Sequence, residues 1–195
     1  MSVNQVPPET IPVPATPHSP NSKLPVVVYR GALLDKTLEG ALQAVDTSEW
    51  PKGGHWKIAQ ENLAATPHYH SITHEAYTVL HGHGTYSLGK SPLDAEVDSD
   101  GNNVGVTLTV REGDVFAFPS GVTHCVTDVS PDYEIIGFYS LNERNSTEEP
   151  YDMEYALDSP EVTCKKREIC ELVPTPVHDP IYGKTGPLPE LWRRT

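Results

Sequence analysis

Apolar residues in this chain fall in short runs of strand length that glycine and proline separate. Val26–Tyr29 is a β-branched run typical of a strand, and similar runs alternate with turn residues from about residue 56 to 140. Helical spacing occurs in one segment, between Asp35, a candidate N-cap, and Glu49. Its apolar positions are Leu34, Leu38, Ala41, Leu42 and Val45. The pattern predicts an all-β protein with one N-terminal helix.

Both ends of the chain are expected to form extended arms. Proline makes up 19 of the 195 residues, about twice the usual ~5%. Residues 1–24 hold six prolines and little that could pack, so we expect either a disordered, unpaired arm or one lying across a partner subunit. Length favours a single domain over residues 25–195, with the polar, Pro-rich end wrapping over it. Lys90–Val104 lacks EF-hand spacing and reads as a solvated hairpin.

Charge excludes several classes of partner. Fourteen Lys and Arg against 27 Asp and Glu give a net charge of −13, which disfavours nucleic acid and anionic membrane surfaces. No apolar run approaches the ~20 residues of a membrane span. Cys125, Cys164 and Cys170 form no CxxC pair, and the N-terminus lacks signal-peptide character. We therefore expect a reduced, cytoplasmic protein.

The histidines supply the candidate chemistry. Five of the nine fall within sixteen residues, and His124 stands apart from them. In His68-Tyr69-His70, the two-residue period of a strand points both imidazoles to one face. Glu75 follows at a distance that lets it return on the neighbouring strand, and His124 offers a fourth ligand. Three imidazoles and a carboxylate suit Fe, Mn, Ni or Zn.

These residues also resemble the two motifs of the cupin (RmlC-like) superfamily, G-x5-HxH-x3–4-E-x6-G and G-x5-PxG-x2-H-x3-N. The matching positions are His68, His70, Glu75 and Gly82 in the first motif, and Gly113, Pro119, Gly121 and His124 in the second. Asn62 replaces the leading Gly and Asp128 the closing Asn, so the motifs span residues 62–82 and 113–128. The flanks, Leu24-Pro25-Val26-Val27 and Asp179-Pro180-Ile181-Tyr182-Gly183, are similar to single-domain, YjlB-like cupins.

The resemblance implies a jelly-roll barrel, the cupin double-stranded β-helix, with one divalent metal inside. The implied ligands are His68, His70, Glu75 and His124, and Fe is favoured over Mn, Ni and Zn. Strand alternation places four aromatic residues in the substrate pocket: Tyr77, Phe116, Phe118 and Phe138. Three further histidines are expected in solvated turns, namely His74, His81 and His83, although alternation from Glu75 could point His81 inward. Cys125 should point away from the face that carries His124.

The function that this implies is a mononuclear metalloenzyme acting on a small organic molecule, most readily an oxygenase of a chelating enol, diketone, catechol or 2-oxo acid. A non-oxidative decarboxylase, isomerase or hydrolase is the alternative within the enzyme class. A non-catalytic small-molecule-binding barrel is the alternative outside it. A homodimer is expected from the family.

Overall fold

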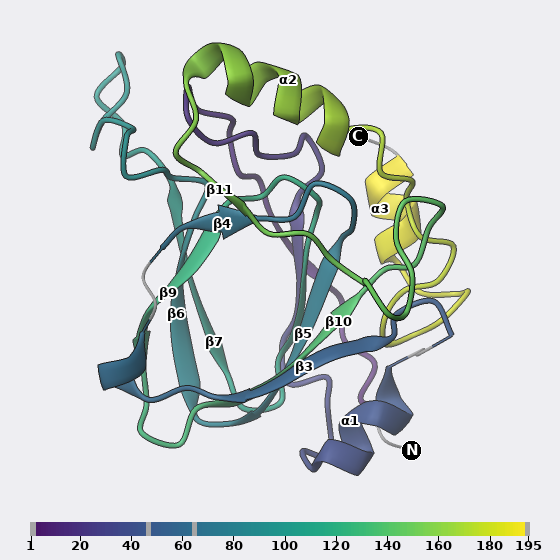
Figure 1. Cartoon of the computed structure of the whole chain (residues 1–195). Coiled ribbons are helices and arrows are strands. Elements are labelled where there is room, and N and C mark those ends of the chain that lie inside the picture. The colour runs from purple at the N-terminus through teal and green to yellow at the C-terminus, as the bar shows by residue number, and fades with distance from the viewer. Residues whose placement is uncertain (1–2, 46–47, 64–65, 194–195) are drawn as a thin grey trace.

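The computed structural model describes residues 3–45, 48–63 and 66–193, and within them two antiparallel sheets face each other as a barrel (Figure 1). The strands are β1 (Glu9–Ile11), β2 (Val26–Tyr29), β3 (Lys52–Lys57), β4 (His68–Tyr69), β5 (Glu75–His81), β6 (His83–Leu88), β7 (Val106–Arg111), β8 (Val115–Phe118), β9 (His124–Val129), β10 (Glu134–Tyr139) and β11 (Glu154–Tyr155).

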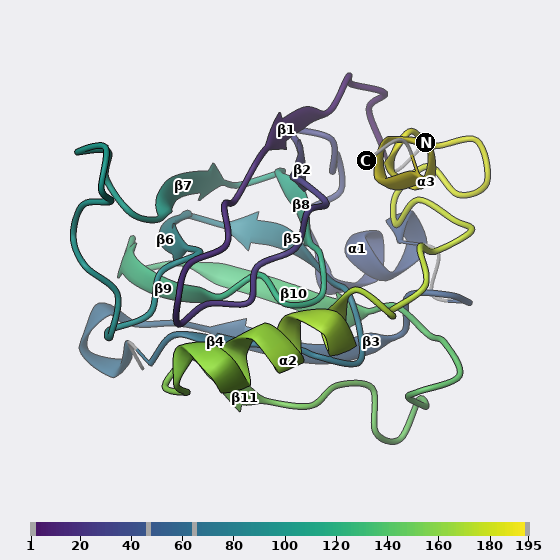
Figure 2. The same ribbon diagram turned by 90° about the horizontal axis from the view of Figure 1, so that it is seen from above.

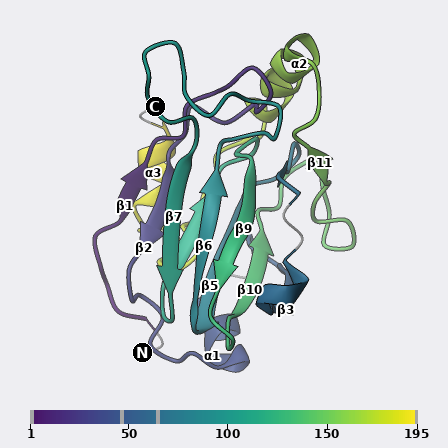
Figure 3. The ribbon, with the colours of Figure 1, turned by 90° about the vertical axis from the view of Figure 1, so that its left-hand side faces the viewer.

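The six-stranded sheet has the order β1-β2-β8-β5-β10-β3 and the five-stranded sheet the order β11-β4-β9-β6-β7. Figure 3 shows β7, β6 and β9 of the second sheet side by side. Neighbours such as β5 and β10, or β6 and β7, pair in antiparallel ladders along most of their length. This two-sheet architecture confirms the predicted all-β jelly roll.

Most buried apolar residues belong to two clusters, one inside the barrel and one on the outer side of the six-stranded sheet. Alternate residues of β2 divide between them, Val26 and Val28 facing inward and Val27 and Tyr29 outward. The inner cluster joins both sheets and includes Tyr77, Val79, Tyr86, Leu88, Leu108, Phe116 and Phe118. The outer cluster packs the six-stranded sheet against the helices and includes Trp50, Leu80, Ile136, Phe138, Leu188 and Trp192.

The prediction of a single helix is wrong. The described residues form three α-helices, α1 (Leu38–Ala44), α2 (Pro160–Cys170) and α3 (Leu188–Arg193), and one 3₁₀ turn, η1 (Gln60–Asn62). Helix α1 is shorter than predicted and is capped by Thr37, whose hydroxyl accepts from the Gly40 N–H. Asp35 instead accepts from the backbone and hydroxyl of Thr37. Residues 46–47 of the predicted helix lie outside the described residues.

Helix α2 crosses one end of the barrel near β4 and β11, whereas α1 and α3 lie beside the six-stranded sheet (Figure 2). Ser159 caps α2 and Pro160 occupies its first turn, a start signal that the sequence carries without apolar periodicity to support it. None of the helices in the described part of the chain has the length and apolar character needed to span a membrane.

Within residues 3–24 the N-terminal arm contributes a strand, so the prediction of an unpaired, disordered segment is wrong there. Glu9–Ile11 pairs with Val26–Val28 and adds β1 to the edge of the sheet. This pairing is possible because the three residues lie between Pro8 and Pro12 and keep their N–H groups. Most of the predicted hairpin at Lys90–Val104 is exposed, although Ser91 is buried, and a bridge joins Val97 to Asn103.

Candidate metal centre

Strand pairing brings the two histidine motifs together inside the barrel. His68 of β4 lies directly opposite His124 of β9 in the antiparallel ladder. His70 follows β4, and its carbonyl accepts from the Gly121 N–H at 2.9 Å. Glu75 begins β5, opposite Phe118 on one neighbouring strand and Tyr139 on the other. Residues of the two motifs, which lie more than fifty positions apart in the chain, therefore come together inside the barrel.

The three imidazoles form a cluster that could hold an ion. One ring nitrogen from each of His68, His70 and His124 lies within 4.8 Å of the others. A Glu75 carboxylate oxygen lies 3.3 Å from Nε2 of His70 and 3.2 Å from Nε2 of His124. His70, His124 and Glu75 are each 3% exposed or less, and His68 is half-buried. The four residues predicted as ligands are thus brought to one place.

Backbone carbonyls orient all three rings through their Nδ1 atoms. Nδ1 of His124 contacts the Val122 carbonyl at 2.9 Å, Nδ1 of His68 contacts that of Thr66 at 3.3 Å, and Nδ1 of His70 contacts that of Asp152. A carbonyl can only accept, so each Nδ1 carries the proton and donates it. In neutral imidazoles the Nε2 lone pairs are then free to face the cluster, as metal-ligating histidines require.

The centre is electrostatically incomplete without a cation. Nε2 of His70, Nε2 of His124 and both Glu75 oxygens are buried and have no hydrogen-bond partner. Burial raises the pKa of Glu75, but the facing imidazoles outweigh it and hold that pKa well below its usual range. Burial likewise lowers the pKa of His70, and the charge of Glu75 overcomes it and raises that pKa. A divalent ion would satisfy these converging acceptors at once, so the donor set fits a metal.

One segment that the sequence did not single out supports His70 from outside. The Asp152 carboxylate accepts from the backbone N–H of Ser71 at 2.8 Å, its hydroxyl at 2.6 Å and the Ile72 N–H at 3.2 Å. The same residue's carbonyl accepts from His70. Asp152 therefore fixes the backbone on the C-terminal side of His70 and the orientation of the His70 ring. It lies in a polar loop whose sequence has no pattern that would have identified this role.

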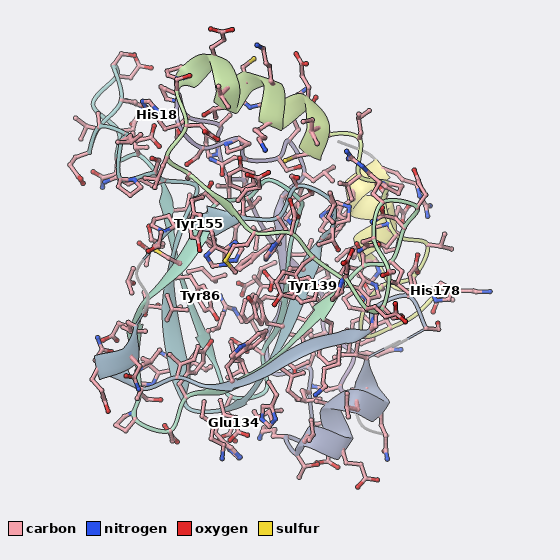
Figure 4. The ribbon with its side chains drawn as sticks, viewed as in Figure 1. His18, Tyr86, Glu134, Tyr139, Tyr155 and His178 are labelled. Atoms are coloured by element: carbon pink, nitrogen blue, oxygen red, sulfur yellow. The ribbon has the colours of Figure 1, made fainter. Side chains whose placement is uncertain are left out.

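The cluster opens into a cavity of about 310 Å³ between the sheets. Tyr86 and Tyr139 point into this space (Figure 4). Tyr139 stacks on Tyr151 at 4.4 Å between ring centres, and both rings lie 5.4 Å from that of His70. The remaining wall is mostly apolar and includes Trp56, Ile58, Leu63, Val126, Ile135 and Met153.

The four residues predicted for the pocket separate into three environments. Tyr77 lines the cavity. Phe116 and Phe118 belong to the inner cluster behind it, where Phe118 lies 4.8 Å from the His124 ring. Phe138 is in the outer cluster, so its predicted place in the pocket is wrong. The two-residue alternation holds along β10, where Ile135 and Tyr139 line the cavity and Ile136 and Phe138 face outward, so the prediction chose the wrong face of this strand.

The other histidines and Cys125 also differ from expectation in part. His81 and His83 are exposed, as predicted for turn positions, which rules out the inward alternative for His81. The prediction of a solvated turn position for His74 is wrong, because this side chain is 1% exposed and its ring contacts that of Trp192. Cys125 borders the cavity, although it was expected on the opposite face from His124. Asn62, at the motif's departing position, also lines the cavity.

Comparison with known proteins agrees with the resemblance that the two sequence motifs indicated. The family model described as cupin matches residues 36–159, well over half of the chain. Protein YjlB of Bacillus subtilis, described as uncharacterised, is 26% identical over 170 residues, covering 86% of each chain.

Two solved structures show more distant likeness. Oxalate decarboxylase from Lactobacillus farciminis matches with a TM-score of 0.31 and 14% identity, over 77% of this chain and 33% of that one. Vicilin from Corylus avellana matches with a TM-score of 0.29 and 22% identity, over 39% and 20% of the two chains. The chain spans a third or less of the length of these structures.

Proposed function

The chain belongs to the cupin family, and on that premise we propose that it is a mononuclear metal-dependent enzyme acting on a small organic molecule. His68, His70, Glu75 and His124 would hold one divalent ion, with Fe favoured over Mn, Ni and Zn. The reaction class that we propose is oxygenation of a chelating substrate.

The observation that carries this proposal is the convergence of two buried imidazole nitrogens on one carboxylate oxygen. Nε2 of His70 and Nε2 of His124 lie 3.3 and 3.2 Å from the same Glu75 oxygen, and all three atoms are buried. Leaving buried acceptors unpaired costs about 1–3 kcal/mol each. A bound ion would remove this cost, because it would coordinate the unpaired acceptors.

The bound ion would supply Lewis acidity and, as Fe, access to dioxygen chemistry. The chain's own residues divide the remaining tasks. Carbonyls of Val122, Thr66 and Asp152 orient the imidazoles, and apolar walls such as Ile58 and Ile135 limit the access of water to the cavity.

The character of the lining favours oxygenation over non-oxidative chemistry. Decarboxylases, isomerases and hydrolases commonly need a group that transfers protons near neutral pH. Among the described lining residues, Glu75 is the one carboxylate, and it is assigned to the ion. Oxygenation of a chelated substrate does not require such a group.

Metal content of the purified chain tests the proposal. We expect about one Fe per chain, and loss of the metal in the His70→Ala/His124→Ala double variant with the fold retained. His83→Ala, which removes an exposed histidine from β6, is the matched control and should keep its metal. Oxygen uptake with chelating substrates then tests the reaction.

Other results would point elsewhere. Zinc as the metal of the active protein, with turnover but no oxygen uptake, would favour the non-oxidative enzymes. Ligand binding without turnover would indicate a binding barrel. Wild-type protein that folds and takes up no metal would contradict the proposal outright.

A further inference from the structure

The cavity contains no cationic side chain among its described lining residues. Glu75 is the one acidic group there, and no Lys or Arg joins it. The other polar groups are imidazoles assigned to the ion, the amide of Asn62, the thiol of Cys125, the indole N–H of Trp56 and the phenols of Tyr77, Tyr86, Tyr139 and Tyr151. The net charge of the occupied cavity is therefore the sum of the charges of the ion, Glu75 and the ligand.

That balance favours a ligand with one negative charge. A divalent ion and the Glu75 carboxylate together leave one positive charge in a buried site. A monoanion neutralises it, whereas a dianion such as a dicarboxylate leaves a buried negative charge without a partner, which is costly. A monocarboxylate has an uncoordinated oxygen that needs a strong donor, and no guanidinium or ammonium lines the described cavity.

The walls favour a flat, largely apolar molecule. Trp56 and Tyr77 lie 6.2 Å apart between ring centres, with Ile58, Val126 and Ile135 completing the surface. Aromatic walls of this kind bind planar rings by stacking and edge contacts. A volume of about 310 Å³ is at the lower end for ligand pockets, so it fits a small ring system.

We infer that the substrate is an uncharged, planar molecule with a hydroxyl group beside a carbonyl or a second hydroxyl, and that it binds as a monoanion. This inference rests on the proposed function, because it needs the ion. On binding, the ligand's O–H bond breaks, the electron pair stays on the oxygen that coordinates, and the proton passes to the buffer. Nothing is oxidised or reduced in this step.

Calorimetry on the full chain loaded with Co²⁺, a redox-stable substitute for Fe²⁺, tests the inference. Maltol, an uncharged hydroxyketone, is the positive probe and oxalate the dianionic one. Titrations in two buffers of different ionisation enthalpy count the protons released. We expect maltol to bind with release of about one proton. Metal analysis after each titration shows whether the probe has removed the ion.

A charge variant separates selectivity from the intrinsic strength of each chelator. Asn62 lines the cavity and is exposed, so Asn62→Lys adds a cation at its edge with little effect on packing. We expect roughly tenfold tighter oxalate binding in this variant and little change for maltol. Asn62→Gln changes the same side chain without adding charge, so it is the matched control and should not strengthen oxalate binding. Met153→Lys, at a lining residue that is 49% exposed, repeats the test independently.

Each result decides a different question. Oxalate binding that neither lysine variant strengthens, or maltol binding without proton release, would overturn the inference while leaving the metal site intact. Failure of the folded wild-type chain to retain Co²⁺ would overturn both the inference and the proposed function.

Discussion

His74 shows how an imidazole beside the candidate ligands serves the fold. Its Nδ1 accepts from the Ser120 N–H at 2.9 Å, so Nε2 carries the proton and donates to the Pro174 carbonyl at 3.2 Å. The ring also packs 4.7 Å from that of Trp192. One neutral side chain thereby joins the barrel, the C-terminal segment and α3. Burial lowers the pKa of His74 to about 4.

This pKa predicts an acid-sensitive contribution to stability. Between about pH 6.5 and pH 4 the unfolded chain binds a proton at His74 that the folded chain does not, so the free energy of unfolding falls as pH falls through this window. The full loss is about 3 kcal/mol, reached near pH 4. His74→Gln, whose amide keeps a donor and an acceptor, should lose this part of the pH dependence.

Urea unfolding between pH 7.5 and pH 4.5, with a chelator present, measures the effect. His83→Gln is the control, because His83 is exposed and should leave the slope unchanged. An unaltered slope in His74→Gln would show that His74 is not the source.

At the scale of elements, the segment before β11 matters most because one residue of it reaches two parts of the site. Asp152 holds Ser71 and Ile72 through its carboxylate and His70 through its carbonyl. Its neighbours Tyr151 and Met153 line the cavity. The position of the cavity rim and the orientation of a candidate ligand are therefore set by the same anchor.

Removing that anchor should weaken metal binding. We expect Asp152→Ala to lower metal affinity by about 10–100-fold, because the loosened loop no longer holds its carbonyl against His70. Competition with a coloured chelator gives the affinity. Glu148→Ala, at an exposed position of the same loop, is the control. Equal affinities in the two variants would contradict an orienting role for Asp152.

Strand alternation predicted the inward positions Tyr77 of β5 and Phe116 and Phe118 of β8, but it was applied to the wrong face of β10. In β10, the residues that line the cavity are Ile135 and Tyr139, while Ile136 and Phe138 face the helices. Gly137 indicates which face of β10 is turned inward, because a Cβ at this position would lie 2.7 Å from the Trp56 ring. A glycine amid large apolar residues marks where an aromatic ring approaches the backbone, and periodicity alone cannot detect this.

For the whole molecule, the sequence predicted the barrel, the meeting of the candidate ligand residues and the polar excursion at 90–104. It did not predict how the ends pack, because that depends on contacts between distant segments. Arg167 of α2, for example, donates to the carbonyls of Thr16 and Pro20 in the arm. Composition could report many prolines there, but not these partners. The homodimer stays a prediction.

Asn21 holds the arm to the barrel and gives a test of its importance. Its amide donates to the carbonyls of Pro14 and Gly89, at 2.6 and 3.0 Å, and accepts from the Thr123 N–H at 3.1 Å. We expect Asn21→Ala to lower the free energy of unfolding by roughly 3 kcal/mol, since buried backbone groups lose their partners. Urea unfolding checks this value, and the exposed Asn103→Ala should be neutral. A loss below about 0.5 kcal/mol, the range of surface substitutions, would mean that the arm is not held through Asn21.

The contact between His70 and Asp152 joins residues 82 positions apart in the chain. During synthesis on the ribosome, His68, His70 and Glu75 emerge long before His124, and His70 gains its carbonyl partner later still. The complete site therefore cannot exist on a growing chain that has not passed residue 152. An ion captured earlier would meet an open, solvated set of side chains, so we expect selective loading of the proposed site only after the barrel has closed.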